Sequence, residues 1–390
     1  MIERTLEKPL KRLATQYPVV TLTGPRQSGK TTLCKKAFPD KTYLSLEDPD
    51  VRQLALSDPR AFLARVKNGA ILDEIQKAPE LVSYIQSMVD SDPTSGRFIL
   101  TVSQQFELTQ AISQSLAGRT AILRLLPFSY DEIYGTDCRV DIDSCLYQGF
   151  YPRIHDQGLN PTKALGFYVN TYIERDVRSI KNIVNLNQFE SFLRLCAANV
   201  GQELNKSRLS NDIGVDLKTI TSWLSVLEAS YIVYLLPPDF KNFRKRVTKS
   251  PKLYFYDVGL ASFLLGIRDP TVMMHHPLRR NLFENFIIME FLKKRFNAVE
   301  NCNLYFYRDN KGNEVDLILD FGPNFIAIEI KSAQTFNKDF LKGLNYYSKI
   351  NGSVKRNILI YSGDAHHQIN GVEIRPYESI GKLDFAAAAN

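Results

Sequence analysis

Cysteine and histidine are scarce in this sequence, and neither is arranged as a metal-binding or disulfide-bonded framework. The 390 residues include five of each. The cysteines are odd in number and scattered, without a CxxC motif, at Cys34, Cys138, Cys145, Cys196 and Cys302. The histidine pairs at 275–276 and 366–367 lack the spacing of a zinc site. These absences argue against a disulfide scaffold and a zinc centre, and favour a reducing setting.

Long apolar runs are also missing. No stretch approaches the roughly 20 apolar residues of a membrane-spanning helix. Met1 is not followed by the charged region, apolar stretch and cleavage site of a signal peptide. We therefore expect no membrane partner, no secretion and a cytoplasmic location.

The sequence does contain enough apolar material for several buried cores. Hydrophobic residues make up 44% of the chain and aromatic residues 11%. At about 100–200 residues per domain, this length predicts two or three domains. The net charge of +7 suits phosphate-rich partners where the positive residues cluster.

Short apolar strands alternate with helical segments in the first third. The strands are expected at 17–23, 42–46, 70–73, 97–102 and 120–125. This alternation predicts an α/β domain whose parallel sheet is covered on both faces and whose active edge lies at the carboxyl ends of the strands. The middle reads as helical, and a helix (282–296) followed by two strands (314–321 and 325–331) indicates a second α/β unit. We expect domains at 1–135, 136–265 and 266–385.

Residues 24–32, Gly-Pro-Arg-Gln-Ser-Gly-Lys-Thr-Thr, fit the pattern GxxxxGK[ST] between an expected strand and an expected helix. The glycines allow the backbone to wrap around phosphate oxygens, while Lys30 reaches the β- and γ-phosphates and Thr31 ligates Mg²⁺. The residues expected to bind ATP are Gly24, Pro25, Arg26, Gln27, Ser28, Gly29, Lys30, Thr31 and Thr32. The alternative is an ordinary glycine-rich turn.

An apolar strand that ends in two acids supplies the second part of this site. Residues 70–74 read Ala-Ile-Leu-Asp-Glu. Asp73 is expected to hold Mg²⁺ with Thr31, and Glu74 to orient or activate the attacking water. Without the preceding P-loop, such a pair would more often be a helix cap or a turn.

Two further polar residues lie where they could complete the site. Ser103, with Thr101, ends the expected strand at 97–102 and would approach the γ-phosphate, unless these hydroxyls bond only to local backbone. Arg119 precedes the fifth strand and could stabilise the transition state in a neighbouring subunit, which predicts a homo-oligomer. The alternative for Arg119 is a solvated surface side chain.

Together these residues resemble the prokaryotic AAA-type P-loop ATPases that carry a C-terminal nuclease-like domain of unknown function. The matching segments are 24–32, 71–76, 115–119, 125–129, 249–252 and 282–286. The resemblance implies an ATPase domain, a winged-helix module and an endonuclease-like domain. One departure is Val102, where the family pattern has glycine before Ser103, and it weakens the sensor role of Ser103.

The middle of the chain contains a basic helical module. Residues 206–214 and 216–227 read as a helix-turn-helix, with Lys218, Thr219 and Ser222 near the exposed start of the second helix. A basic stretch with interleaved aromatics follows, in which Lys241, Arg244, Lys245, Arg246 and Lys249 suit the phosphates of double-stranded DNA. The alternative is a packing module with a solvated basic loop.

The two strands near the C-terminus close around Gly322 and Pro323. An even loop there sets Asp316 opposite Glu329 and Glu314 opposite Lys331, on the face away from an apolar face. Facing carboxylates repel each other unless a cation lies between them. Asp316 and Glu329, with Lys331, resemble the PD-(D/E)XK nucleases, in which the acids hold metal and the lysine positions water. Glu284 on the preceding helix could add a ligand.

Two other interpretations of this hairpin remain open. It could be an inactive nuclease-like fold, or an amphipathic hairpin with a solvated charged face and an ion pair between Glu314 and Lys331.

Three functions therefore compete. The first is an ATPase that couples Mg²⁺-ATP hydrolysis to rearrangement of a DNA-associated, nuclease-like half. The second is a metal-dependent nuclease with ATP as a switch. The third is an ATP-gated protein interaction module without catalysis.

Overall fold

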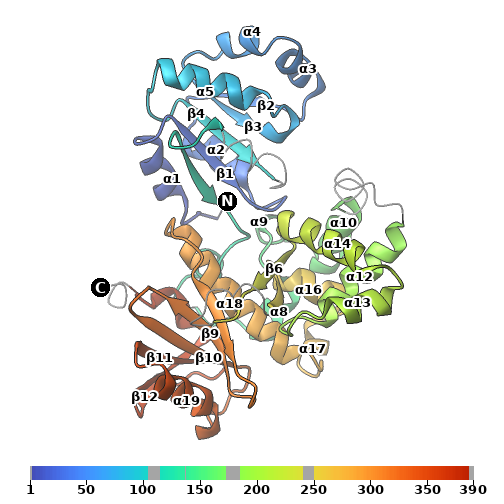
Figure 1. Cartoon of the computed structure of the whole chain (residues 1–390), viewed down its shortest axis with the longest axis vertical. Helices are drawn as coiled ribbons and strands as arrows, with labels where there is room; N and C mark the ends of the chain where they lie inside the picture. The colour runs from blue at the N-terminus through green and yellow to red at the C-terminus, as the bar shows by residue number, and fades with distance from the viewer. Residues whose placement is uncertain (1, 104–114, 137, 173–184, 240–249, 386–390) are drawn as a thin grey trace. The chain divides into compact units, whose positions relative to one another are not determined.

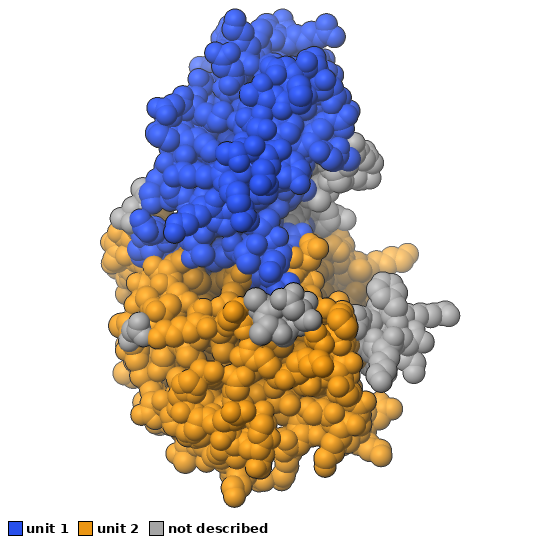
Figure 2. Space-filling view, turned by 90° about the vertical axis from the view of Figure 1, so that its left-hand side faces the viewer, with its two compact units in different colours: residues 1–128, 229–231, 295–300 blue, residues 129–228, 232–294, 301–390 orange. Residues whose placement is uncertain are grey.

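The computed structural model describes residues 2–103, 115–136, 138–172, 185–239 and 250–385. The chain forms two compact units, which Figure 2 colours blue and orange. Unit 1 comprises residues 1–128, 229–231 and 295–300, and unit 2 comprises 129–228, 232–294 and 301–390. Of the predicted DNA contacts, Lys241, Arg244, Lys245, Arg246 and Lys249 lie outside the described residues.

Unit 1 is built on a five-stranded sheet with the order β2-β3-β4-β1-β5, in which every pairing is parallel. Its strands are β1 (Val19–Thr23), β2 (Thr42–Ser45), β3 (Ala70–Asp73), β4 (Phe98–Val102) and β5 (Thr120–Arg124). Its helical segments are α1 (Glu7–Ala14), α2 (Lys30–Ala37), α3 (Pro49–Ser57), α4 (Pro59–Ala64), η1 (Ile75–Lys77) and α5 (Leu81–Ser91). The predicted parallel sheet is therefore confirmed.

Helices cover both faces of this sheet (Figure 1). Successive residues of a strand alternate between the faces, so Phe98 and Leu100 join one core and Ile99 joins the other. One core packs α3, α4 and α5, and the other packs α1 and α2. Because both faces are covered, the strands β1, β3 and β4 are buried at every position rather than at alternate ones.

The helical part of unit 2 precedes its large sheet in the sequence. Its helices are α7 (Tyr130–Tyr134), α8 (Ile142–Gln148), α9 (Pro152–Gln157), α10 (Pro161–Tyr172), α12 (Leu186–Ala198), α13 (Lys206–Ile213), α14 (Leu217–Ala229), α16 (Val258–Leu264), α17 (Pro270–Met273) and α18 (Arg279–Asn297). Gly214 ends α13 in the left-handed conformation, and Asp216 accepts from the backbone N–H of Thr219 at the start of α14. After α14, β6 (Val233–Leu236) and β7 (Lys252–Phe255) form an antiparallel pair.

The remainder of unit 2 is a mixed six-stranded sheet with the order β12-β13-β11-β10-β9-β8. Its strands are β8 (Leu304–Arg308), β9 (Glu314–Asp320), β10 (Phe325–Lys331), β11 (Val354–Tyr361), β12 (His367–Ile369) and β13 (Val372–Pro376). The helical segments η3 (Lys338–Leu341), α19 (Lys342–Ile350) and η4 (Tyr377–Lys382) complete it. This second α/β region was also predicted.

Candidate functional site

The loop between β1 and α2 has a backbone that only glycine suits at two positions. Gly24 has φ +149°, and a side chain there would clash with the carbonyl oxygen of Leu125. Gly29, the N-cap of α2, has φ +90°. The loop therefore keeps a cradle open at the N-terminus of α2, where backbone N–H groups favour an anion.

Lys30 carries a buried charge at this cradle. Only 5% of the residue is exposed, and its ammonium donates to the carbonyl oxygens of Gly24 (3.0 Å) and Pro25 (2.7 Å). Burial lowers the pKa of Lys30 to about 8, although Glu74 and Asp73 oppose the shift. Among the described residues, Lys30 makes no ion pair within 4 Å, so its charge is available to an incoming anion.

Arg4 supports the loop from the N-terminal segment, which the sequence did not reveal. Its guanidinium donates to the carbonyl oxygens of Ser28 (3.2 Å) and Leu126 (2.6 Å) and lies over the ring of Phe128. The hydroxyl oxygen of Ser28 is buried and has no hydrogen-bond partner among the described residues. A buried hydroxyl without a partner in a loop of this shape fits a phosphate oxygen.

The predicted metal ligands Thr31 and Asp73 are in contact. The Thr31 hydroxyl lies 2.9 and 3.0 Å from the two carboxylate oxygens of Asp73. Tyr43 on β2 donates to the same carboxylate at 2.8 Å, and Thr101 on β4 donates at 2.5 Å. Three hydroxyls thus surround Asp73, which is 5% exposed. The Asp73 carboxylate and the Thr31 hydroxyl offer only oxygen ligands, and such a set of ligands fits Mg²⁺.

Tyr43 is a second residue that sequence analysis missed. Burial, followed by its hydrogen bond to Asp73, raises the pKa of Tyr43 to about 12. The phenol therefore remains a donor near neutral pH and orients the carboxylate. Its position on β2, the strand that pairs with β3, was the only available signal.

Glu74 follows β3 in a left-handed backbone conformation, with φ +58°. Its backbone N–H donates to Thr101 (3.0 Å), and its carboxylate accepts from Ser103 (2.5 Å) and from the side-chain amide of Gln76. The structure therefore brings Ser103 to Glu74, although Val102 stands where the resembling family has glycine. Gln76 also donates to Ser103, at 3.0 Å.

Arg119 is not brought to this cluster. It pairs with Asp90 on α5 and donates to the carbonyl oxygen of Ala117. Its side chain is 34% exposed. Pro25, Arg26, Gln27 and Thr32 remain in the loop or the first turn of α2.

The hairpin β9-β10 has the predicted register up to the pair Ile328–Leu317, one position short of Glu329 and Asp316. Beyond it, the backbone N–H of Ile330 donates to the Asp316 carboxylate at 2.8 Å. Asp316 and Glu329 are only 2% and 7% exposed, so the interpretation as a solvated charged face is wrong. Burial raises the pKa of Glu329, and the neighbouring Asp316 raises it further, against the effect of Lys331.

The ion pair between Glu314 and Lys331, which belonged to the alternative interpretation as an amphipathic hairpin, is absent among the contacts of the described residues. Lys331 pairs with Glu329 and lies 3.7 Å from Asp316. Glu314 pairs instead with the buried ammonium of Lys252 on β7, at 2.5 Å. The role of Lys252 was not predicted from the sequence.

Glu284 on α18 also forms an ion pair with Lys252. Its carboxylate accepts from the Lys252 ammonium (3.0 Å) and from the hydroxyl of Tyr254 (2.6 Å). Within the described ranges, no three or more His, Cys, Asp or Glu side chains are grouped so that they could hold a metal ion. The predicted ligand set of Asp316, Glu329 and Glu284 therefore does not fit a metal as the structure stands.

Comparison with known proteins decides the type of the first site. Residues 16–134 match the family model of an AAA domain. The chain carries a P-loop domain of the AAA type. Residues 139–271 and 279–380 match two further models, each described as a domain of unknown function, DUF8612 and DUF4143.

Similar proteins cover most of the chain. Uncharacterized proteins of Mycobacterium bovis and Mycobacterium tuberculosis are each 29% identical over 332 residues, covering 84% of this chain and 73% of theirs. Among solved structures, the Walker-type ATPase PABY2304 of Pyrococcus abyssi has a TM-score of 0.48 at 15% identity, covering 68% of this chain and 96% of that one.

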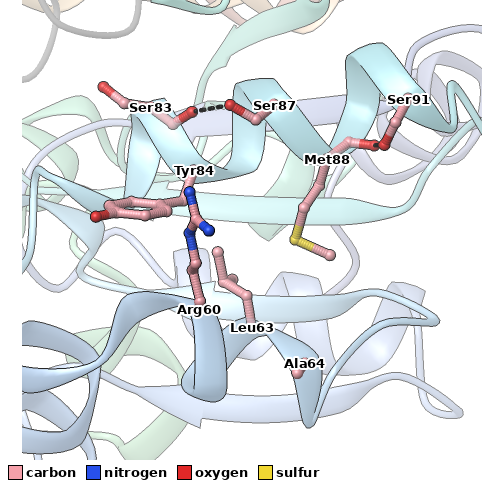
Figure 3. Close-up of a pocket in the computed structure, with 8 residues that line it drawn as sticks. All are labelled: Arg60, Leu63, Ala64, Ser83, Tyr84, Ser87, Met88 and Ser91. Carbon is pink, nitrogen blue, oxygen red and sulfur yellow. Dashed lines mark hydrogen bonds between the residues drawn. The ribbon is translucent and has the colours of Figure 1, made fainter.

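A separate pocket of about 490 Å³ lies between α4 and α5 of the AAA domain (Figure 3). It is lined by Arg60, Leu63, Ala64, Ser83, Tyr84, Ser87, Met88 and Ser91. None of these residues belongs to the P-loop or to the Asp73–Glu74 pair, so the pocket is distinct from the cluster described above.

Two further expectations concern partners. Lys218, at the start of α14, is exposed. Throughout the part of the chain that the structure describes, no helix has both the length and the apolar character of a membrane span.

Proposed function

We propose that this chain binds ATP with Mg²⁺ at the P-loop of its AAA domain and hydrolyses the bond to the γ-phosphate. The observation that carries the proposal is the contact between Thr31 and Asp73 at the loop that holds the buried ammonium of Lys30. Two oxygen ligands and a positive charge that makes no direct ion pair among the described residues, at the carboxyl edge of a parallel sheet, suit a metal-bound polyphosphate.

Lys30 would exchange its two carbonyl acceptors for oxygens of the β- and γ-phosphates. The N–H groups at the start of α2 would bind the same phosphates. Thr31 and Asp73 would hold Mg²⁺, which, when bound, would neutralise charge on the phosphates. Tyr43 and Thr101 would keep the Asp73 carboxylate oriented through the hydrogen bonds that they already make.

Glu74 would accept a proton from the attacking water. Its carboxylate is engaged by Ser103 and Gln76 in the structure, so one of these contacts must lengthen when water binds. Ser103 lies beside Glu74 at the end of β4, which supports a role next to the γ-phosphate.

The test is ATP binding and steady-state hydrolysis by wild type, Lys30→Met and Glu74→Gln, each with and without duplex DNA. We expect Lys30→Met to lose both binding and turnover, and Glu74→Gln to keep binding but lose turnover. Stimulation by DNA would establish coupling to DNA. If wild type binds ATP but never hydrolyses it, the proposal of hydrolysis fails and ATP acts only as a switch, as in an ATP-gated interaction module.

Arg119 is proposed to act on the ATP of a neighbouring copy in a homo-oligomer. Its partial exposure and its location outside its own P-loop cluster support a role in trans. Mixing Arg119→Ala with Lys30→Met should restore hydrolysis, because an intact P-loop then meets an intact Arg119. Mixing Glu74→Gln with Lys30→Met is the matched control and should restore nothing. Full activity of Arg119→Ala alone would refute the assignment.

The second domain is proposed to be a winged-helix module that contacts DNA. The order α13, α14 and the β6-β7 pair supports this arrangement, as does the exposed Lys218. Phosphate contacts predict an affinity for duplex DNA that falls steeply with salt. Fluorescence anisotropy from 50 to about 200 mM salt measures that slope, and binding unaffected by salt would exclude the proposal.

A nuclease function for the third domain is the remaining candidate. The approach of Lys331 to Asp316 and Glu329 favours it. The commitment of Glu284 and Glu314 to Lys252 argues instead for a nuclease-like fold without metal chemistry. Cleavage of DNA with any divalent metal, lost in Asp316→Ala, would establish the nuclease.

A further inference from the structure

Unit 2 contains four closely placed acids, and two lysines form their shortest ion pairs; the guanidinium of Arg308 also lies 3.9 Å from Glu314. We call Glu284, Glu314, Asp316 and Glu329 the acidic cluster. Lys331 pairs with Glu329 and approaches Asp316, whereas Lys252 pairs with Glu284 and Glu314. Each lysine therefore bridges two carboxylates, and the two lysines come from different strands.

Lys252 is buried together with Glu284, whereas the side chain of Glu314 is 31% exposed. Lys252 is 3% exposed, and its ammonium lies 3.0 Å from a Glu284 oxygen and 2.5 Å from a Glu314 oxygen. These partners belong to α18 and β9, so one ammonium links a helix, its own strand β7 and the large sheet. A buried ammonium with two carboxylate partners is stable only as long as that geometry is kept.

The backbone holds Lys252 in place from both sides. The backbone of Lys252 pairs with Leu236 on β6 along one edge of β7, and it forms an antiparallel bridge with Glu203 along the other edge. The side chain also runs past the ring of Phe306, with the ammonium 5.4 Å from the ring centre. The position of the charge is thus fixed by the fold, unlike that of a lysine on a surface loop.

A divalent cation would need the same oxygens. Mg²⁺ and Mn²⁺ take carboxylate oxygens at about 2.0–2.2 Å, and their binding beside a fixed ammonium is opposed by charge repulsion. The Glu284 carboxylate already accepts hydrogen bonds from Lys252 and Tyr254, and the Glu314 carboxylate already pairs with Lys252.

We propose that Lys252 is the resident cation of the acidic cluster, which holds the place of a divalent metal and keeps the cluster metal-free. Removal of this one ammonium converts the cluster into a binding site for a divalent cation. The proposal concerns a site distinct from the P-loop and does not depend on ATP hydrolysis.

The experiment is Mn²⁺ binding by electron paramagnetic resonance to the full chain without nucleotide. Every protein carries Asp73→Asn, which removes the proposed metal ligand at the P-loop. We compare this parent with Lys252→Met, which keeps the chain length but not the charge, and with Lys252→Arg, which keeps the charge. Circular dichroism and urea unfolding establish that each variant is folded.

We expect no bound Mn²⁺ in the parent or in Lys252→Arg. Lys252→Met should gain one Mn²⁺ with a dissociation constant of roughly 10⁻⁶–10⁻⁴ M, as at other carboxylate sites. Adding Asp316→Asn or Glu329→Gln to Lys252→Met should abolish the gained site.

Two results would overturn the proposal. One is Mn²⁺ binding by the parent that Asp316→Asn removes. The other is a folded Lys252→Met protein that binds no Mn²⁺. If Lys252→Met does not fold, the parent decides the matter: no Mn²⁺ there supports the resident cation, and Mn²⁺ removed by Asp316→Asn refutes it.

Discussion

Two lysines of this protein are buried to nearly the same extent, but only Lys252 forms direct ion pairs among the described residues. Lys30 is 5% exposed and Lys252 is 3% exposed. The ammonium of Lys30 donates to neutral carbonyl groups, and burial lowers its pKa. Burial acts in the same direction on Lys252, but Glu284, Asp316 and Glu314 outweigh it and raise the pKa.

The difference separates a binding site from a structural one. A buried charge without a counter-ion costs stability, and such a cost is expected where a protein must receive an anion. A buried charge with two counter-ions is already satisfied and gains nothing from a ligand. The contrast therefore supports the two proposals, ligand binding at the P-loop and internal neutralisation in the acidic cluster.

Lys252→Met should give the largest effect on stability. Loss of one partner from a buried ion pair leaves uncompensated carboxylates, which costs about 3–5 kcal/mol. Lys30→Met should lower the free energy of unfolding by less in the absence of nucleotide, because it removes two hydrogen bonds to carbonyl groups but no ion pair. Urea unfolding of both variants, followed by circular dichroism, measures the two free energies of unfolding. Equal destabilisation by the two substitutions would contradict the predicted difference between the two lysines.

Lys30→Met should give the largest effect on ATP hydrolysis. Loss of a positioned donor to the developing phosphate charge lowers kcat by about 10²–10³-fold. Lys36→Met is the matched control, since Lys36 lies on the same helix and pairs at the surface with Glu7. A steady-state phosphate-release assay measures both variants. Turnover of Lys30→Met within a few-fold of wild type would mean that its uncompensated charge has no catalytic use.

The sequence predicted those features of the P-loop site that lie within short, continuous segments of the chain. The P-loop, the strand that ends at Asp73, and the strand that ends near Ser103 each lie within a short segment. Parallel strands place their carboxyl ends at one edge, so the meeting of Thr31 with Asp73 followed from topology. The hairpin register followed from the even loop in the same way.

Contacts between distant segments could not be predicted in this way. Arg4 meets carbonyl groups 24 and 122 residues away, and no periodic pattern links them. Lys252 lies 32 residues before Glu284 in the sequence and belongs to a strand outside the large sheet. The alternative with an ion pair between Glu314 and Lys331 considered the hairpin alone, without β7, the strand that supplies Lys252.

The affinity for ATP should fall above pH about 8 because the pKa of Lys30 lies there in the nucleotide-free protein. Below that pH, Lys30 is already charged and ATP binding takes up no proton at this group. Above it, binding must protonate Lys30, so the dissociation constant rises by at most about tenfold per pH unit. Calorimetry from pH 7 to 9 in buffers of different ionisation enthalpy measures the proton uptake. Lys30→Arg stays charged and should remove this dependence.

Gln76→Ala should give the smallest effect, an increase in turnover of about 3- to 10-fold, which corresponds to one net hydrogen bond. The amide of Gln76 donates to the Glu74 carboxylate and so competes with the water that Glu74 is proposed to activate. KM for ATP should not change, because Gln76 makes no contact with the P-loop among its described hydrogen bonds. Lys77→Ala in the same turn is the control. A fall in kcat would show instead that Gln76 positions Glu74 for the reaction, as Tyr43 is proposed to position Asp73.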